Sequence, residues 1–266
     1  MAASMTEAHE RASLGTHLQV LLSHYGPQNW WPAQTRFEVI IGAYLTQNTS
    51  WRNVELAIAN LRRARILNLS GIRTVPLRKL EALIKPSGFF RQKARRLKIF
   101  VRFLDTGYSG SLSRMFAQPT DELRAELLSL EGIGRETADS ILLYAGGHPV
   151  FVVDAYARRI FDTQRHGIIA GAKTMDYDQL RLIIEAAVLR DLLPYSLPAA
   201  DNPRHPPSRM SRAQRSDAAR LFGEIHAAIV RTGNEHCRSI PQCEGCPLQS
   251  FLPKISRENA TLSRQD

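Results

Sequence analysis

The sequence predicts an all-α protein, and two observations support this prediction. Apolar residues recur three and four positions apart along most of the chain, which is the spacing of one face of an α-helix. The one strand-like run is the β-branched stretch "HPVFVVDAY" at 148–156. A single short run of this kind between helices is typical of an extended connector rather than of a sheet.

A series of apolar stripes predicts the helices in chain order. Each stripe places aliphatic or aromatic residues along one helix face, which we expect to be buried. The last helix should end near Gly233, because glycine is typical of helix C-termini. The stripes run over residues 37–45, 54–61, 94–104, 123–130, 138–145, 180–188 and 218–229.

Length and charge narrow the class of protein. At 266 residues the chain can bury a substantial core in one large or two modest domains. A formal charge of +10 favours a polyanionic partner such as nucleic acid or an anionic surface, although a basic surface also fits an ordinary solvated protein. The first residues do not resemble a secretory signal, and no apolar run is long enough to cross a bilayer. We therefore expect an intracellular, cytoplasmic monomer without a membrane partner.

Two segments interrupt the helical pattern. Residues 193–217 are rich in Pro, Ser and Arg, and we expect a mobile basic insertion that does not pack. The three cysteines, Cys237, Cys243 and Cys246, lie within ten residues of one another. This spacing is poor for a disulfide framework and favours a metal or a cluster.

The stretch "LEGIGRETADSILLYA" places Gly132 and Gly134 between two predicted helices. Glycine tolerates positive φ and close backbone approach, so "GIG" suits a tight turn. The second helix should begin near Arg135, where backbone amides and the guanidinium could hold a phosphate. An ordinary corner between two helices is the plain alternative.

Asp154 is a lone acid in the apolar run "FVVDAY". An acid at this place either caps the helix that begins with "AYARRI" or is held for chemistry. The position alone leaves both interpretations open.

Together these stretches resemble the endonuclease III superfamily of DNA glycosylases. "LEGIGRETADSILLYA" followed by "FVVDAYARRI" is similar to its helix–hairpin–helix and the loop that carries its catalytic Asp. "FEVIIGAYLTQNTSWRNV" and "PSGFFRQKARRLK" resemble two further motifs, so that the resemblance covers about Trp30 to Ile160, with a weaker continuation to Leu248. It implies double-stranded DNA with a damaged base as the partner. It also implies a six-helix domain at 34–150, a second helical domain from 1–33 and 151–266, and a DNA cleft between them.

The resemblance also indicates a branch of the superfamily. Bifunctional members carry a lysine that forms an imine with the sugar, and here that position is Glu136, which cannot form one. The adenine-mismatch branch carries a glutamate at the position of Gly42. The combination of "WWP", "GAYLTQNT", "PSGFF" and "GIGRETAD" most resembles the endonuclease III-like 3-methyladenine DNA glycosylases. The resemblance implies a monofunctional N-glycosylase that would rely on Asp154. The alternatives are a bifunctional glycosylase/lyase for oxidised pyrimidines that uses another amine, and a non-catalytic DNA-binding protein.

The resemblance assigns further roles. Trp30, Trp31, Tyr44 and Glu136 would line the substrate pocket, with the indoles stacking on a cationic flipped base. Burial in the core is the plain alternative for the two tryptophans and for Tyr44.

Gln47 and Phe89 occupy the places of residues that fill the gap left by an extruded nucleotide. Lys93, Arg95 and Arg96 would contact phosphates. Otherwise Gln47 caps its helix, Phe89 is buried, and the basic residues form a solvated helix face.

The cysteines resemble the C-terminal pattern that holds a [4Fe–4S] cluster in relatives. That pattern has four cysteines, and Leu252 stands at the place of the fourth. A labile cluster, a non-cysteine ligand such as His236, or a loop that has lost its metal all stay open.

Overall fold

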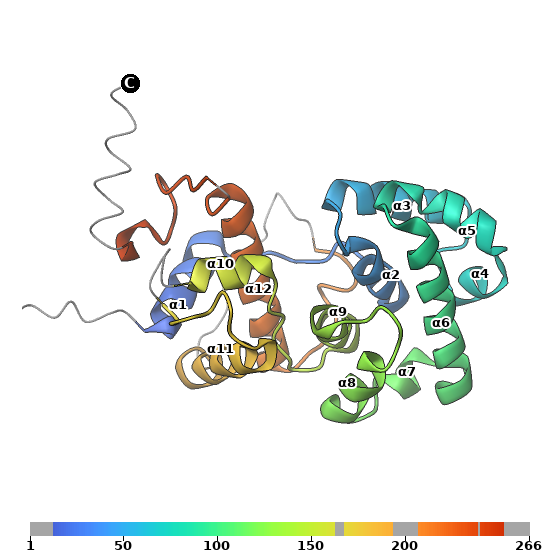
Figure 1. The fold of residues 1–266 in the computed structure, drawn as a ribbon. Helices are drawn as coiled ribbons and strands as arrows, with labels where there is room; N and C mark the ends of the chain where they lie inside the picture. Colours follow the sequence, from blue (N-terminus) through green and yellow to red (C-terminus); the bar gives the residue numbers. More distant parts are fainter. Residues whose placement is uncertain (1–12, 163–167, 194–206, 239, 253–266) are drawn as a thin grey trace, which may run out of the picture. The chain divides into compact units, whose positions relative to one another are not determined.

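The computed structural model describes residues 13–162, 168–193, 207–238 and 240–252. Over these residues the chain is helical and has no strand, only an isolated bridge between Asp162 and Ile169 (Figure 1), which confirms the all-α class. The β-branched run lacks regular structure over residues 147–154, as predicted for a connector. No helix of the described residues is long and apolar enough to cross a membrane.

The chain divides into two compact units. We call one the hairpin unit, which comprises Pro27–Val152 and Ala199–Glu224, and the other the carboxylate unit, which comprises Met1–Gly26, Val153–Pro198 and Ile225–Asp266. This division differs from the expected one, because residues 27–33 and the described residues 207–224 group with the hairpin unit.

The hairpin unit is built around α2 (Arg36–Thr46), whose start follows from its sequence. Thr35 Oγ1 accepts from Glu38 N at 3.1 Å, and the Glu38 carboxylate accepts from Gln34 N at 2.9 Å, in the manner of a capping box. The predicted stripe is buried, with Ile40, Ile41 and Tyr44 fully inaccessible. The other helices are α3 (Trp51–Arg63), α4 (Leu69–Thr74), α5 (Leu77–Leu83), η1 (Lys85–Ser87), α6 (Phe90–Tyr108), α7 (Leu112–Met115), α8 (Thr120–Leu128), α9 (Arg135–Ser140) and the π-helix η2 (Ile141–Gly146).

The carboxylate unit contains α1 (Leu14–Tyr25), α10 (Ala155–Phe161), α11 (Tyr177–Asp191) and η3 (Gln249–Phe251). The unit boundary falls within α12 (Asp217–Glu235). This helix does not end at Gly233 as predicted. The glycine instead lets Tyr156 pack closely, since a Cβ at 233 would lie 2.1 Å from the Tyr156 ring.

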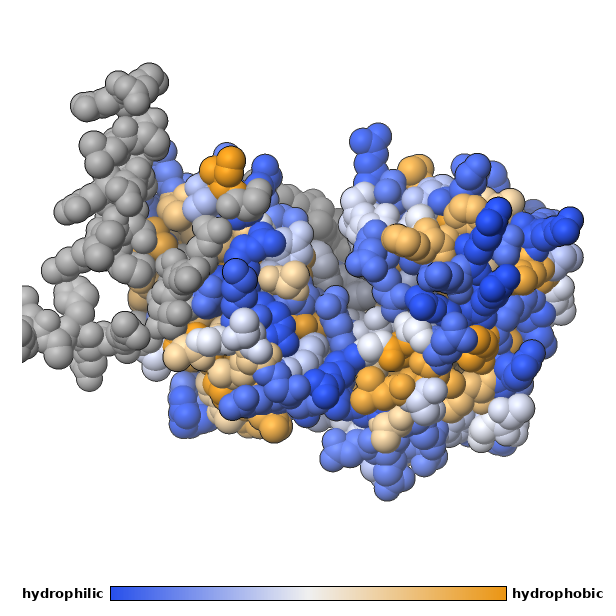
Figure 2. All heavy atoms as spheres, viewed as in Figure 1, coloured by the Kyte–Doolittle hydropathy of each residue, from blue (hydrophilic) through white to orange (hydrophobic). Residues whose placement is uncertain are grey.

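The expectation that residues 193–217 do not pack is wrong for the second half of the segment; residues 194–206 lie outside the described residues. Ser208 and Met210 are buried. Ser208 Oγ donates to Trp31 O at 3.1 Å, and Arg215 donates to Tyr144 O at 2.9 Å. These hydrogen bonds to main-chain carbonyls explain why a polar, proline-containing segment packs. Elsewhere the visible surface is largely hydrophilic, with apolar residues in small groups (Figure 2).

A buried ion pair joins α8 to α9. Arg124 donates through Nε to Asp139 Oδ1 at 2.6 Å and through Nη2 to Oδ2 at 3.1 Å. The Asp139 side chain is fully buried and that of Arg124 is 13% exposed. Two parallel charge-assisted bonds fix both the distance and the angle between the helices on either side of the "GIG" turn.

Replacing Asp139 by Ala should lower the free energy of unfolding by about 3–5 kcal/mol, because the variant removes the carboxylate that makes two hydrogen bonds to the largely buried Arg124 guanidinium. Urea denaturation measures the loss. Asp217→Ala, which removes the partner of the exposed Arg220, is the matched control and should cost less than about 1 kcal/mol. Equal losses in the two variants would show that the buried pair does not fasten the hairpin.

Candidate nucleic-acid interface and active site

The turn between α8 and α9 uses its two glycines differently. Gly132 has φ +81°, a conformation that favours glycine, and the Arg96 side chain lies where a Cβ would be, with Nε 2.0 Å from that place. Gly134 has φ −92°, and no heavy atom lies within 4 Å of the place its Cβ would take. The fold itself therefore leaves open space beside Gly134, at the start of α9.

Gln47 ends α2 and faces this turn. Its Nε2 donates to Gly132 O and to Thr137 Oγ1, both at 2.9 Å, and its Oε1 accepts from Arg96 Nη1 at 3.3 Å. These residues border a cavity of about 420 Å³. It is lined by Thr46, Gln47, Asn48, Arg96, Gly132, Ile133, Gly134, Glu136 and Thr137. The structure thus brings together Gln47, both hairpin glycines and Glu136, with Arg135 exposed at the start of α9.

Phe89 is exposed and strained. Its side chain is 62% exposed, and its backbone is left-handed, with φ 44° and ψ 27°. A bulky residue in this region costs about 1–3 kcal/mol and persists only where its surroundings hold it. An exposed aromatic ring on a strained turn is typical of a functional position, and burial of Phe89 is excluded.

Lys93 is not on the surface, contrary to the prediction that it contacts phosphates. Only 1% of it is exposed, and Nζ donates to Leu45 O at 2.9 Å and to Ser87 O at 2.7 Å. Burial, and secondarily the nearby Arg96 guanidinium, lowers the pKa of Lys93 to about 8. Its neighbour Arg95 is exposed, so the basic face expected here is carried by arginines.

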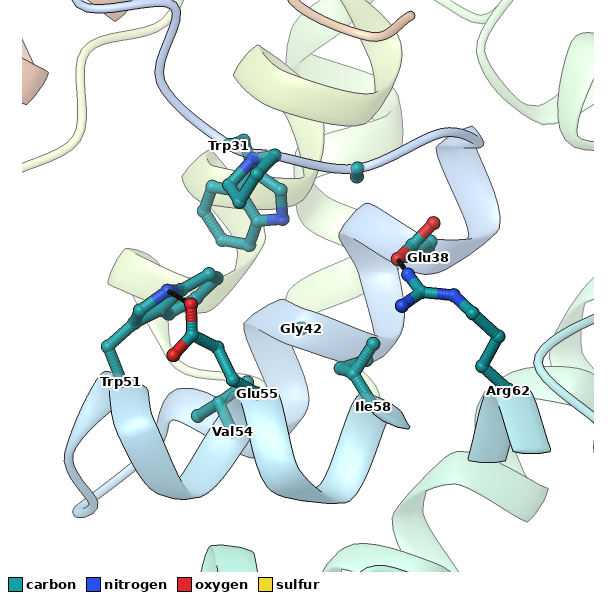
Figure 3. A pocket seen from close by; sticks show the side chains of 10 residues that line it. Trp31, Glu38, Gly42, Trp51, Val54, Glu55, Ile58 and Arg62 are labelled. Atoms are coloured by element: carbon teal, nitrogen blue, oxygen red, sulfur yellow. Dashed lines mark hydrogen bonds and ion pairs between the residues drawn. The ribbon is translucent and has the colours of Figure 1, made fainter. Parts of the chain in front are cut away.

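Trp31 lines a second cavity, of about 270 Å³, between α2, α3 and the segment before α2 (Figure 3). Its ring meets the Trp51 ring edge-on, with centroids 5.9 Å apart. Trp51 Nε1 donates to Glu55 Oε1 at 3.0 Å, whereas the ion pair of Glu38 and Arg62 lies at the opposite end. The cavity therefore combines two aromatic rings with a carboxylate beside them.

Gly42 forms part of the same cavity. A Cβ at this position would lie 3.2 Å from two atoms of the Trp31 indole, so the glycine lets the ring lie close against α2. A glutamate here, as in the adenine-mismatch branch, would compete with Trp31 for this space.

The other two aromatic residues predicted for the pocket lie elsewhere. Trp30 borders a separate small cavity with Tyr144, Arg215 and Glu224. Trp31 adopts a left-handed φ of 73°, and the two adjacent indoles border different cavities. Tyr44 is fully buried against Phe100, with ring centroids 6.0 Å apart, because it lies on the apolar stripe of α2.

Asp154 is both a helix cap and a held acid. Its Oδ1 accepts from Ala157 N at 2.8 Å and so caps α10, while its Oδ2 lies 3.5 Å from His226 Nε2 on α12. The side chain is 12% exposed, and Val152 and Val153 before it are buried. One carboxylate oxygen is thus fixed by the main chain and the other faces an imidazole.

Sequence reasoning missed Trp51, Glu55 and His226. Trp51 lies three residues before Val54 and continues the apolar stripe of α3, so the pattern assigns it to the core. His226 lies within the buried face of α12, where a lone histidine gives no signal of its own. Only the tertiary structure brings it to Asp154.

The cysteine loop does not fit a [4Fe–4S] cluster, which is held by four thiolates as a rule. Cys237 and Cys246 are buried, and Leu252 is buried at the place of the fourth cysteine. Burial, with the nearby Cys243 and Cys237 thiols, raises the pKa of Cys246 to about 11. His236 Nδ1 bonds to Gln242 O at 3.1 Å. Among the described residues, no three His, Cys, Asp or Glu side chains are grouped so that they could hold a metal.

Comparisons with known proteins show the family and the fold. Residues 41–182 match the family described as HhH-GPD superfamily base excision DNA repair protein. A Methanocaldococcus jannaschii protein provisionally named as a DNA repair glycosylase is 41% identical over 88% of this chain and 92% of its own length. Thermotoga maritima endonuclease III is 28% identical over 80% of this chain and 81% of its own length.

Solved structures show the same fold. The structure of H. pylori 3-methyladenine DNA glycosylase (MagIII) bound to 1,N6-ethenoadenine has a TM-score of 0.67 and 30% identity, over 84% of this chain and 98% of that one. A trapped endonuclease III–DNA covalent intermediate has a TM-score of 0.63 and 21% identity, over 92% and 96%. The chain therefore belongs to the HhH-GPD superfamily of base excision DNA repair proteins, which includes the endonuclease III DNA glycosylases.

Proposed function

We propose that the protein is a monofunctional DNA glycosylase that hydrolyses the N-glycosidic bond of a flipped, alkylated purine such as 3-methyladenine in double-stranded DNA. The observation that carries the proposal is the set of residues lining the cavity beside Gln47 and the "GIG" turn, which we call the hairpin cavity. Glu136 lies there at the place of the imine-forming lysine, and the residues that line the cavity include no lysine. In the proposed reaction water therefore attacks the sugar in place of an amine, and Asp154 is the acid that we propose to assist it.

The chemistry asks little of the protein. An alkylated purine with a positive charge leaves with the electrons of the bond to C1′, and this cancels its charge. Its departure needs no protonation by an acid. The Asp154 carboxylate would stabilise the oxocarbenium ion that develops on the sugar and would accept a proton from the attacking water. Because Oδ1 is fixed by the cap on α10, we assign this role to Oδ2, which faces His226 at 3.5 Å.

The cavity of Trp31 and Trp51 suits the departing base. Indole faces attract cations, and both indoles line this cavity, packed edge to face against each other. Glu55 adds negative charge at the rim. The similar H. pylori protein is a 3-methyladenine DNA glycosylase whose structure holds 1,N6-ethenoadenine, a modified purine, and this supports the same class of substrate here.

The proposed opening of the DNA uses Phe89, Gln47 and the hairpin. Phe89 would fill the gap left by the flipped nucleotide, and Gln47 would contact the opened pair. The open space at Gly134, beside the first amides of α9 and Arg135, suits a phosphate.

The lyase alternative finds little support in the described lysines of α6. Lys93 and Lys98 each direct Nζ to two main-chain carbonyls, so neither amine is presented as a nucleophile. The cysteine loop takes no part in the proposed reaction.

Replacing Asp154 by Asn should reduce base release by at least about 100-fold, because it removes the charge that stabilises the sugar cation. Asn keeps the helix cap, so binding to a duplex with an uncleavable lesion analogue should persist. Asp176→Asn is the matched control, since Asp176 caps α11 in the same unit. Single-turnover excision and a binding titration measure the two effects. Unchanged excision by Asp154→Asn would favour the non-catalytic alternative.

Trp31→Ala and Trp51→Ala should slow excision of cationic 7-methylguanine by about tenfold more than excision of neutral hypoxanthine, because a desolvated cation–π contact is worth about 1–2 kcal/mol. Trp30→Ala is the control, because Trp30 borders a different cavity and should leave the ratio unchanged. Comparison of kcat/KM for the two bases measures the ratio. An equal loss for both bases would contradict a role for these rings in selecting cations.

A further inference from the structure

We propose that Lys93 is a positioning residue. It couples the two segments that we propose to enter DNA, namely the Gln47 segment (residues 45–47) and the Phe89 turn (residues 87–89). The inference rests on the proposed function, because it presumes that these segments distort the duplex. It assigns Lys93 neither a phosphate contact nor a role as a nucleophile.

One ammonium group connects three parts of the hairpin unit. Lys93 lies on α6, one turn after Phe89, and Lys93 N donates to Phe89 O at 3.1 Å. Its Nζ bonds to Leu45 O, two residues before Gln47, and to Ser87 O, two residues before Phe89. The side chain therefore fixes the Phe89 turn relative to the end of α2.

The acceptors are suited to a cation. Leu45 lies in the last turn of α2, and Ser87 is the last residue of η1. The Leu45 carbonyl lies at the C-terminal end of α2, which carries the negative end of the helix dipole, and the Ser87 carbonyl ends a short 3-10 turn, so a positive donor satisfies both acceptors at once. No other kind of side chain offers three donors on so flexible a stem.

The strain at Phe89 explains why such a link is needed. A left-handed phenylalanine relaxes unless its neighbours hold it. Ser87 is fully buried, and its Oγ donates to Ile84 O at 2.8 Å, so the turn before Phe89 is held by Ser87 and by Lys93. We expect the Lys93 hydrogen bonds to keep the Phe89 side chain at a fixed position relative to Gln47. This reduces the ordering needed when both side chains enter the DNA duplex together.

The Lys93 ammonium group is buried without a carboxylate partner, which supports the inference that the lysine holds the two segments in place. A methionine would fill the same space without removing a charge from water, so packing alone does not explain an amine that is 1% exposed. The Arg96 guanidinium nearby makes the charge less favourable still.

The test uses Lys93→Met in the full chain, with Lys98→Met as the matched control. Lys98 lies on the same helix and also donates to two carbonyls, Arg73 O at 2.9 Å and Val75 O at 2.6 Å, but neither lies in a segment proposed to enter DNA. Nucleotide flipping is followed by fluorescence of 2-aminopurine in a duplex, excision by kcat and KM, and folding by thermal melting. Lys93→Gln, which keeps a donor, replaces the Met variant if that variant does not fold.

We expect Lys93→Met to reduce flipping and kcat by at least about tenfold with little change in KM, whereas Lys98→Met keeps both even if it melts earlier. In a Phe89→Ala background, Lys93→Met should add less than about a twofold loss, because the wedge that it positions is gone. The inference would be overturned if the losses of Lys93→Met and Phe89→Ala multiply in the double variant. It would also be overturned if Lys98→Met loses as much flipping and kcat as Lys93→Met. Absence of flipping in the wild-type protein would instead refute the proposed function.

Discussion

The "GIG" turn, where the Arg96 side chain packs against Gly132 and the Gln47 carboxamide bonds to both, is the place where the supports of the hairpin unit meet. The guanidinium of Arg96 occupies the space where any other residue at 132 would place its Cβ. This contact brings α6 to the "GIG" turn, and Gln47 bridges the same turn to α2 through its carboxamide. Because Lys93 lies on α6 and bonds to α2, the hairpin, the Gln47 segment and the Phe89 turn share one set of supports. Their relative positions are therefore set by the fold before any DNA is bound.

The proposed chemistry depends on which side chains line the two cavities of the hairpin unit. In the proposed mechanism Glu136, on the hairpin cavity, stands where an imine mechanism would need an amine. Trp31 lies close against Gly42, where a Cβ would be 3.2 Å from the indole. What the protein retains is a carboxylate, Asp154, fixed by a helix cap and a histidine. A site of this kind suits a base that already carries positive charge and leaves without help.

Sequence patterns predicted the helices, because burial follows the helical period, and the resemblance predicted the hairpin, whereas the catalytic role that it gives Asp154 stays a prediction. They failed where tertiary contacts override a local rule. Lys93 lies among basic residues that face solvent, yet two distant carbonyls draw its amine inward. Trp30 and Trp31 are adjacent, but a positive φ directs them to different cavities. His226 had no sequence signal, since its role depends only on its distance from Asp154.

We propose that the protein removes a base without cleaving the strand. The most direct measurement incubates the purified protein with an end-labelled duplex carrying one 7-methylguanine and separates the products with and without alkali. We predict an intact strand without alkali and a break at the lesion after alkali, because water rather than an enzyme amine attacks the sugar. A break without alkali, together with a borohydride-trapped protein–DNA adduct, would contradict excision by water alone and place the protein among the lyases.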